Sequence, residues 1–267
     1  MRIALPVACL AALVPVVAAA AAPEHLELHE GDKIVLIGNT LAERMQYFGN
    51  WETLLHARFP EKHLVVRDLG WSADELTLRP RSLNFQDHGH RLEDEQPDVI
   101  LAFFGFNESF LGDDGVEKFK QDLANFIAET TSTAYNGESP PTLVLVSPIA
   151  NEDLADRKIM AGARNNANIA LYTAAMRDVA AEHDVQFVDL FAPTKDRDDA
   201  APLTFNGCHL NETGDRVVGE LLDAGLFGEQ TAGMHNSERL AAIHREVNEK
   251  NLQFFYDYRA VNGYYIY

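Results

Sequence analysis

The sequence predicts an α/β fold, a three-layer α/β/α sandwich built on a parallel sheet. Two observations lead to this prediction. Five short apolar runs rich in β-branched and aromatic residues recur along the chain, as strands do. Amphipathic helical patterns lie between these runs. Regular alternation of strand and helix is typical of a parallel sheet that is covered by helices on both faces.

The predicted strands come in the order 33–38, 63–70, 98–105, 142–148 and 185–191. The first, third and fourth runs are nearly continuous in apolar residues, which indicates burial on both faces. In a sheet of this kind the active site lies at the carboxyl ends of the strands. The residues that directly follow each strand are therefore the first candidates for function.

The helical patterns cover the segments between the strands. Residues 41–59 place five apolar side chains at helical spacing, and Gly49 with Asn50 leaves open whether this is one helix or two. Further helices are predicted at 116–131, 165–184 and 212–227, and a polar loop at 193–205.

Both ends of the chain differ from the middle. We predict a signal peptide at 1–22, one hydrolase-like domain at 23–230, and a C-terminal helix with an aromatic tail at 231–267. The tail either packs back on the core or leads toward an additional domain or partner.

In the first segment, Arg2 is followed by a long apolar run that ends in alanines. This pattern predicts a cleaved secretory signal and a secreted or periplasmic protein, with no stable membrane insertion after removal. A membrane anchor is the alternative, and Pro6, Pro15 and the many alanines favour cleavage. The mature chain keeps one cysteine, Cys208, so an internal disulfide is excluded.

The charge is strongly acidic. The chain has 22 basic and 41 acidic side chains, a formal net charge of −19. Nucleic acids and anionic membranes would be repelled and are not expected as partners.

The strand ends carry a distinctive set of residues. The first strand ends in Gly38-Asn39-Thr40 and the second is followed by Gly70. The third runs into Gly105-Phe106-Asn107-Glu108, and the last is followed by Asn206-Gly207-Cys208-His209. In this order the four segments resemble the four blocks of the SGNH hydrolase superfamily, also called GDSL esterases and lipases. The resemblance implies a flavodoxin-like sandwich with a five-stranded parallel sheet and an ester hydrolase activity.

The resemblance also implies roles for individual residues. Thr40 stands at the position of the nucleophile, His209 at that of the base and Asn206 at that of its acidic partner. The backbone N–H groups of Thr40 and Gly70 and the side-chain amide of Asn107 would bind the oxyanion. The implied substrate is a short acyl ester, such as an acetyl group on a polysaccharide. Neither a cofactor nor a metal is implied.

Two residues depart from the family pattern. Threonine replaces serine, and its methyl group stiffens the side chain and crowds the approach of a carbonyl. Asparagine replaces aspartate at 206, where its oxygen can accept the Nδ1–H of His209 but cannot stabilise an imidazolium by charge. An alternative function is therefore a weakened or inactive module that binds a carbohydrate or a protein partner within a larger assembly.

Simpler structural roles compete with these assignments. Thr40 can be a helix N-cap, and Gly70 can be a turn glycine that needs a positive φ. Ser72 and Ser109 are either substitute nucleophiles or caps. Glu108 either replaces the missing acid or lies on the rim of the site.

Four further residues have a default reading. His88 and His90 are more typical of a solvated loop than of a metal site. Cys208 is expected to be a lone thiol rather than a nucleophile. Trp51 is expected in the core and Trp71 in a cleft, where an aromatic face can stack on a sugar ring.

Overall fold

The computed structural model describes residues 25–79, 91–154, 163–197, 201–229 and 237–256. Within them, five parallel strands form one sheet with the order β2-β1-β3-β4-β5. The strands are β1 (Lys33–Gly38), β2 (Val65–Asp68), β3 (Val99–Phe103), β4 (Thr142–Val146) and β5 (Gln186–Val188). All five lie inside the predicted segments. The predicted signal peptide, His88 and His90 lie outside the described residues.

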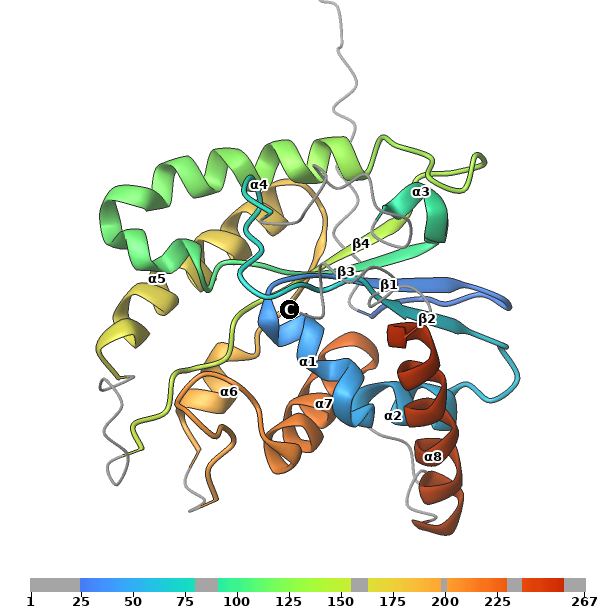
Figure 1. The fold of residues 1–267 in the computed structure, drawn as a ribbon. Helices are drawn as coiled ribbons and strands as arrows, with labels where there is room; N and C mark the ends of the chain where they lie inside the picture. Colours follow the sequence, from blue (N-terminus) through green and yellow to red (C-terminus); the bar gives the residue numbers. More distant parts are fainter. Residues whose placement is uncertain (1–24, 80–90, 155–162, 198–200, 230–236, 257–267) are drawn as a thin grey trace, which may run out of the picture.

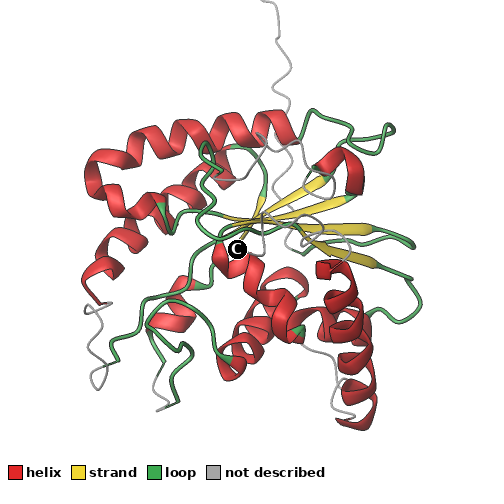
Figure 2. Ribbon diagram, in the orientation of Figure 1, coloured by secondary structure: helices red, strands yellow, loops and turns green. Residues whose placement is uncertain are grey.

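Helices cover both faces of this sheet, as Figures 1 and 2 show. The long helices are α1 (Thr40–Phe48), α2 (Asn50–Arg58), α4 (Val116–Thr130), α5 (Ala163–Glu182), α7 (Glu212–Phe227) and α8 (Ser237–Phe254). Helices α4 and α5 lie on one face, and α1, α2 and α7 lie on the other. The three-layer sandwich is thereby confirmed.

The central strands are buried on both sides because their side chains alternate between two cores. Ile34 and Leu36 of β1 point into the core shared with α1, α2 and α7. Val35 and Ile37 point into the core shared with α4 and α5. A strand between two apolar layers has no polar face, which explains why the sequence run is continuously apolar.

Gly49 divides the first helical segment in two. It adopts a left-handed conformation with φ of 63°, and its N–H bonds to the carbonyl of Met45 at the end of α1. Glycine at this position ends one helix and lets the next start in a new direction. The open alternative is thus decided in favour of two helices.

Three short helices were not predicted. They are α3 (Leu92–Glu95), the 3₁₀ helix η2 (Glu108–Gly115) and α6 (Phe191–Lys195). The last of these overlaps the predicted polar loop at 193–205, whose beginning is therefore helical.

Helix α8 packs back on the core. His244 Nε2 donates to the carbonyl oxygen of Phe48 at 2.6 Å, and Lys250 pairs with Glu52 at 2.7 Å. Lys250 also donates to the carbonyl of Val66 on the edge strand at 3.0 Å. The aromatic residues beyond Tyr256 lie outside the described part of the chain. Among the helices described, none has the length and apolar character needed to cross a bilayer.

The strand order locates the crevice of the fold. From β1 the chain moves to β2 at one edge, whereas from β3 it moves to β4 and β5 on the other side. The carboxyl ends of β1 and β3 therefore flank the switch point where sheets of this type bind ligands.

Candidate active site

The turn after β1 delivers Thr40 to this switch point. Gly38 has φ of 122°, and a Cβ atom on it would lie 2.1 Å from the carbonyl oxygen of Phe103 on β3. Only glycine fits there. The Asn39 side chain then accepts from the N–H of Leu41 at 3.0 Å and caps α1. Thr40 is thus the first residue of the helix, and the N-cap reading for it is wrong because Asn39 fills that position.

The loop after β2 lies directly against the start of α1. A Cβ atom on Gly70 would lie 2.5 Å from the backbone nitrogen of Glu43, so close approach rather than a positive φ requires glycine there. The N–H of Gly70 donates to Asp68 Oδ1 at 2.8 Å. The N–H of Trp71 donates to the carbonyl of Gly38 at 2.8 Å. The Gly70 loop and the Thr40 turn therefore form one unit, in which the Gly70 donor already has a partner.

Asn107 follows β3 on the same edge of the sheet. Its Nδ2 donates to the carbonyl oxygen of Asp74 at 3.1 Å. An amide nitrogen carries two N–H groups, so a single bond to a carbonyl orients the side chain and leaves a second donor.

Glu108 is buried beneath these loops rather than on the rim, which corrects the expectation for this residue. Its two carboxyl oxygens accept from the N–H groups of Leu76 and Gly105, at 3.0 and 2.9 Å. Burial raises the pKa of Glu108 to about 7, against the lowering effect of these hydrogen bonds. Glu108 therefore ties the loop after β2 to the turn after β3, and it braces the site instead of serving as a partner for histidine.

The two alternative serine hydroxyls are held in structural hydrogen bonds. Ser72 donates to the carboxylate of Glu43, and Ser109 donates to the carbonyl of Phe106 at 2.6 Å. Neither hydrogen bond joins the hydroxyl to the His209 imidazole. Trp51 is in the core, as expected, with 2% of its surface exposed, while Trp71 is half-buried.

The loop before α7 carries His209 to helix α1. Arg44 lies one turn after Thr40 and donates to the carbonyl oxygen of Leu210 from Nε and Nη2, at 3.1 and 2.9 Å. On the other side, the Glu152 carboxylate accepts from the N–H groups of Leu203 and Thr204, both at 2.7 Å. The loop is therefore held from two sides. Sequence reasoning missed both Arg44 and Glu152, although Glu152 lies only four residues after the predicted strand 142–148.

His209 is half-buried between aromatic and charged neighbours. The Phe205 ring stacks on it with centroids 5.7 Å apart, and the guanidinium of Arg44 lies over the same Phe205 ring at 4.9 Å from its centroid. Burial, followed by the positive charge of Arg44, lowers the pKa of His209, and Glu43 offsets part of that effect. The imidazole is thereby kept neutral at pH 7, the form that a general base requires.

Asn206 contacts the His209 ring, but it does so with its amide nitrogen and not with the amide oxygen that the sequence predicted. Its Nδ2, not its oxygen, lies 2.8 Å from His209 Nδ1. Its Oδ1 accepts from the backbone N–H groups of His209 and Cys208, at 3.0 and 3.4 Å. Burial raises the pKa of the Cys208 thiol, which keeps it protonated, as befits a thiol that is not a nucleophile.

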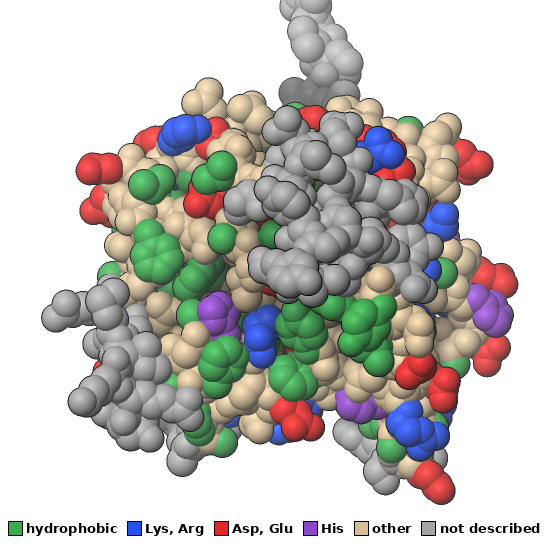
Figure 3. Space-filling view, in the orientation of Figure 1, with side chains coloured by type: hydrophobic (Ala, Val, Ile, Leu, Met, Phe, Trp, Pro, Cys, Tyr) green, Lys and Arg blue, Asp and Glu red, His purple; other side chains and the backbone are tan. Residues whose placement is uncertain are grey.

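Exposed aromatic side chains lie beside this site. Tyr47 and Phe205 are 47% and 41% exposed, and both rings contact the guanidinium of Arg44. Figure 3 shows apolar side chains gathered over α1 on this face of the molecule. These exposed rings form an apolar rim around Arg44, next to the half-buried histidine.

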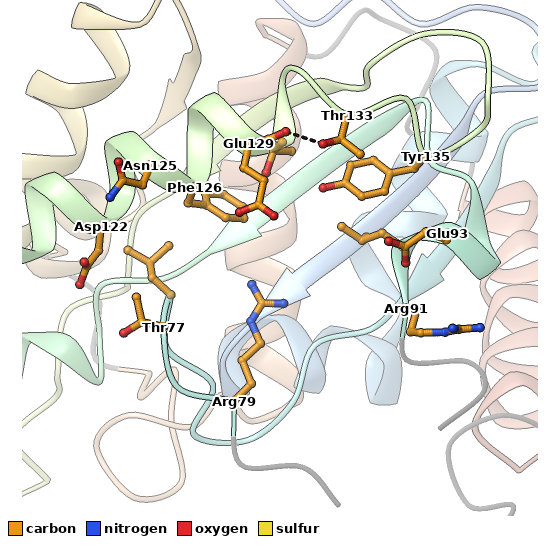
Figure 4. A pocket seen from close by; sticks show the side chains of 13 residues that line it. Thr77, Arg79, Arg91, Glu93, Asp122, Asn125, Phe126, Glu129, Thr133 and Tyr135 are labelled. Atoms are coloured by element: carbon orange, nitrogen blue, oxygen red, sulfur yellow. Dashed lines mark hydrogen bonds between the residues drawn. The ribbon is translucent and has the colours of Figure 1, made fainter. Parts of the chain in front are cut away.

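A cavity of about 420 Å³ lies on the α4 side of the sheet and is shown in Figure 4. Arg79 points into it toward Glu129 and Tyr135, and burial lowers the pKa of Arg79. The described residues that line this cavity include none of the predicted site residues. Size alone therefore does not identify the site.

Comparison with known proteins places these observations in a family context. The profile of the GDSL-like lipase/acylhydrolase family matches residues 36–217. No curated protein sequence matches the chain significantly.

Three solved structures share the fold. An alpha/beta hydrolase enzyme from the metagenome of Lake Arreo, Spain, is 20% identical, with a TM-score of 0.57 over 76% of this chain and 99% of that one. A gut microbial diltiazem-metabolizing enzyme is 19% identical, with a TM-score of 0.60 over 76% of this chain and 48% of that one. An acetylxylan esterase from Geobacillus stearothermophilus is 16% identical, with a TM-score of 0.57 over 78% and 100% of the two chains.

Proposed function

Because this chain belongs to the GDSL-like lipase/acylhydrolase family and is a carboxylic ester hydrolase, we propose that its substrates are short acyl esters of carbohydrates, acetyl esters above all. We propose further that Thr40 is the nucleophile and His209 the base. The observation that carries the assignment is the link between Arg44 and Leu210, which holds the histidine loop against the helix that begins at Thr40.

In the proposed reaction, His209 Nε2 takes the proton of the Thr40 hydroxyl while Oγ1 attacks the acyl carbon. The carbonyl π electrons move to the oxygen, and the resulting oxyanion is bound by donors at the switch point. The intermediate collapses, the C–O bond to the alcohol breaks, and the alcohol leaves with the proton from His209. His209 then takes a proton from water as the water oxygen attacks the acyl-threonine, the bond to Thr40 Oγ1 breaks and Oγ1 takes the proton back, so that the carboxylic acid is released and Thr40 is restored.

Three donors would serve the oxyanion. The N–H of Thr40 belongs to the first turn of α1, where N–H groups have no carbonyl partner within the helix. The second N–H of Asn107 adds a side-chain donor. The N–H of Gly70 is shared with Asp68, so its contribution would be weaker than that of the other two.

Two features support a small acyl group on a carbohydrate. The methyl group of Thr40 narrows the approach to its own oxygen, which favours acetyl over longer chains. Phe205 stacks on His209, and both Phe205 and Tyr47 contact Arg44, so the exposed parts of these two rings add apolar surface beside the histidine loop against which a sugar ring can pack. The similarity to an acetylxylan esterase fold agrees with this substrate class.

The test is hydrolysis of a chromogenic acetate ester and of acetylated xylo-oligosaccharides by the purified chain, together with labelling by a fluorophosphonate. Thr40→Ala and His209→Ala are each expected to lower kcat/KM by at least about 10³-fold and to abolish labelling. Ser72→Ala is the matched control, since it removes a neighbouring hydroxyl, and it should retain activity. Full activity in Thr40→Ala would refute the assignment, and an inert parent protein would favour a carbohydrate-binding or partner-binding module.

We also propose that residues 1–22 direct export and are removed, so that the enzyme acts outside the cytoplasm on polysaccharide esters. N-terminal sequencing of protein expressed with its full chain tests this point. A mature start near residue 23 supports export, and an intact Met1 in all of the purified material contradicts it.

A further inference from the structure

The side chain next to His209 is that of Asn206, whose amide has an oxygen at one end and a nitrogen at the other. The oxygen of Asn206 accepts from the N–H of His209 at 3.0 Å and from that of Cys208 at 3.4 Å, and the thiol of Cys208 lies 3.7 Å from the same oxygen. Three donors therefore converge on Oδ1. An amide oxygen is an acceptor and an amide nitrogen is only a donor, so these contacts determine which end of the amide faces the backbone.

The remaining end of the amide determines where the imidazole carries its proton. Asn206 Nδ2 lies 2.8 Å from His209 Nδ1. Because Nδ2 donates, Nδ1 must accept, and a neutral ring that accepts at Nδ1 has its hydrogen on Nε2. A general base at Nε2 needs the opposite tautomer, with the hydrogen on Nδ1 and a lone pair on Nε2.

Rotation of the amide does not relieve this conflict. A rotated Asn206 would turn its NH₂ group toward the N–H groups of Cys208 and His209, and these part-buried donors would lose their acceptor. The Phe205 ring packs against one face of the imidazole, with centroids 5.7 Å apart. A carboxylate at position 206 would have no such conflict, since one oxygen could accept from the backbone and the other from Nδ1–H.

We propose that Asn206 is a positioning residue that holds neutral His209 as its Nε2–H tautomer, so that the enzyme rests in a form that must rearrange before it can act. This inference rests on the proposed function for its effect on rate, but the tautomer itself can be observed without substrate. In a serine protease, the same aspartate-to-asparagine exchange leaves the geometry intact and lowers turnover about 10⁴-fold through the wrong tautomer.

The experiment combines nitrogen NMR with kinetics on the full chain. Long-range ¹H–¹⁵N spectra at a pH above the titration of His209 distinguish a protonated from an unprotonated ring nitrogen, and the His209→Gln variant assigns the signals. We expect Nδ1 unprotonated and Nε2 protonated in the parent protein, and the reverse in Asn206→Asp. We also expect Asn206→Asp to raise kcat at least about tenfold, with little change in KM.

Asn211→Asp is the matched control. It adds the same charge two residues from His209 and keeps the cap of α7, with the loss of one exposed hydrogen bond from Asn211 Nδ2 to the carbonyl of Pro202. It should leave the tautomer unchanged. A parent ring with its hydrogen on Nδ1, or an Asn206→Asp ring with an unchanged tautomer, overturns the inference. If the tautomer reverses but neither protein hydrolyses acetate esters or reacts with a fluorophosphonate, the inference stands and the proposed function fails.

Discussion

The candidate site has two halves, which are braced in the same way but differ in the role of the side chain at their centre. The donor half consists of the loops after β2 and β3, with Gly70 and Asn107. The histidine half is residues 203–211. In each half one carboxylate accepts two backbone N–H groups and joins segments that are distant in sequence, Glu108 in the first and Glu152 in the second.

The difference lies in burial and in chemical symmetry. Glu108 is 7% exposed and its two oxygens are equivalent, so it can satisfy both loops at once. In the histidine half, Glu152 is only partly buried and the contact to the ring is made by Asn206, whose ends cannot be exchanged. The donor half therefore fixes only the positions of its loops, whereas the proposed role of the histidine half is also to fix which ring nitrogen of His209 carries the proton.

The largest expected effect comes from breaking the donor half. Glu108→Ala leaves the N–H groups of Leu76 and Gly105 buried without acceptors, and each such group costs about 1–3 kcal/mol. We expect the free energy of unfolding in urea to fall by about 3 kcal/mol. A loss of less than about 1 kcal/mol would mean that Glu108 does not hold the donor half more firmly than Glu152 holds the histidine half.

The same side chain predicts a dependence of stability on pH. Burial raises the pKa of Glu108 to about 7 in the folded protein, above the usual value of 4.5. Between these values the folded state holds a proton that the unfolded state has lost, so this group's contribution to stability falls as pH rises from about 4.5 to about 7. Relative to Glu108→Gln, the parent should lose up to about 3 kcal/mol over that range in pH-dependent unfolding. Parallel curves for the two proteins would contradict the prediction.

The histidine half should respond in activity more than in stability. Glu152→Ala releases Leu203 and Thr204, and a shift of about 1 Å in His209 can lower turnover about 10²-fold. We expect kcat for acetate esters to fall between about tenfold and 10²-fold, with a smaller loss of stability than in Glu108→Ala. Glu138→Ala, an exposed glutamate outside both halves, serves as the control. If Glu152→Ala unfolds the protein as strongly as Glu108→Ala, the contrast between the halves is lost.

The smallest effect is expected when the proposed nucleophile Thr40 is replaced by serine, which keeps the hydroxyl. Thr40→Ser removes one methyl group and leaves the helix start in place, since Asn39 provides the cap. One methyl group in an enzyme pocket is worth about 1–3 kcal/mol, so we expect kcat/KM to rise about tenfold. Esters with longer acyl chains should gain most. A serine variant slower than the parent would show that the methyl group helps to position the hydroxyl.

The sequence predicted the sheet well because its strands are buried on both sides. Continuous apolar runs such as 98–105 leave little ambiguity, and parallel topology then brings the strand ends to one edge. The short helices α3, η2 and α6 were missed because a few residues cannot display a helical period. Which end of the Asn206 amide faces His209 depends on two backbone N–H groups in a loop. The burial of Glu108 depends on a second loop, at Leu76, that is distant in sequence. Neither follows from residue type and order.

The position of α8 has a consequence for biogenesis. This helix contacts α1 and α2 through Phe48 and Glu52, so the last described segment covers elements made from the first sixty residues. During synthesis the α1–α2 surface stays uncovered until residue 250 has left the ribosome. The covering of α1 and α2 is therefore among the last steps of folding on a growing chain, and it depends on residues made about two hundred positions later.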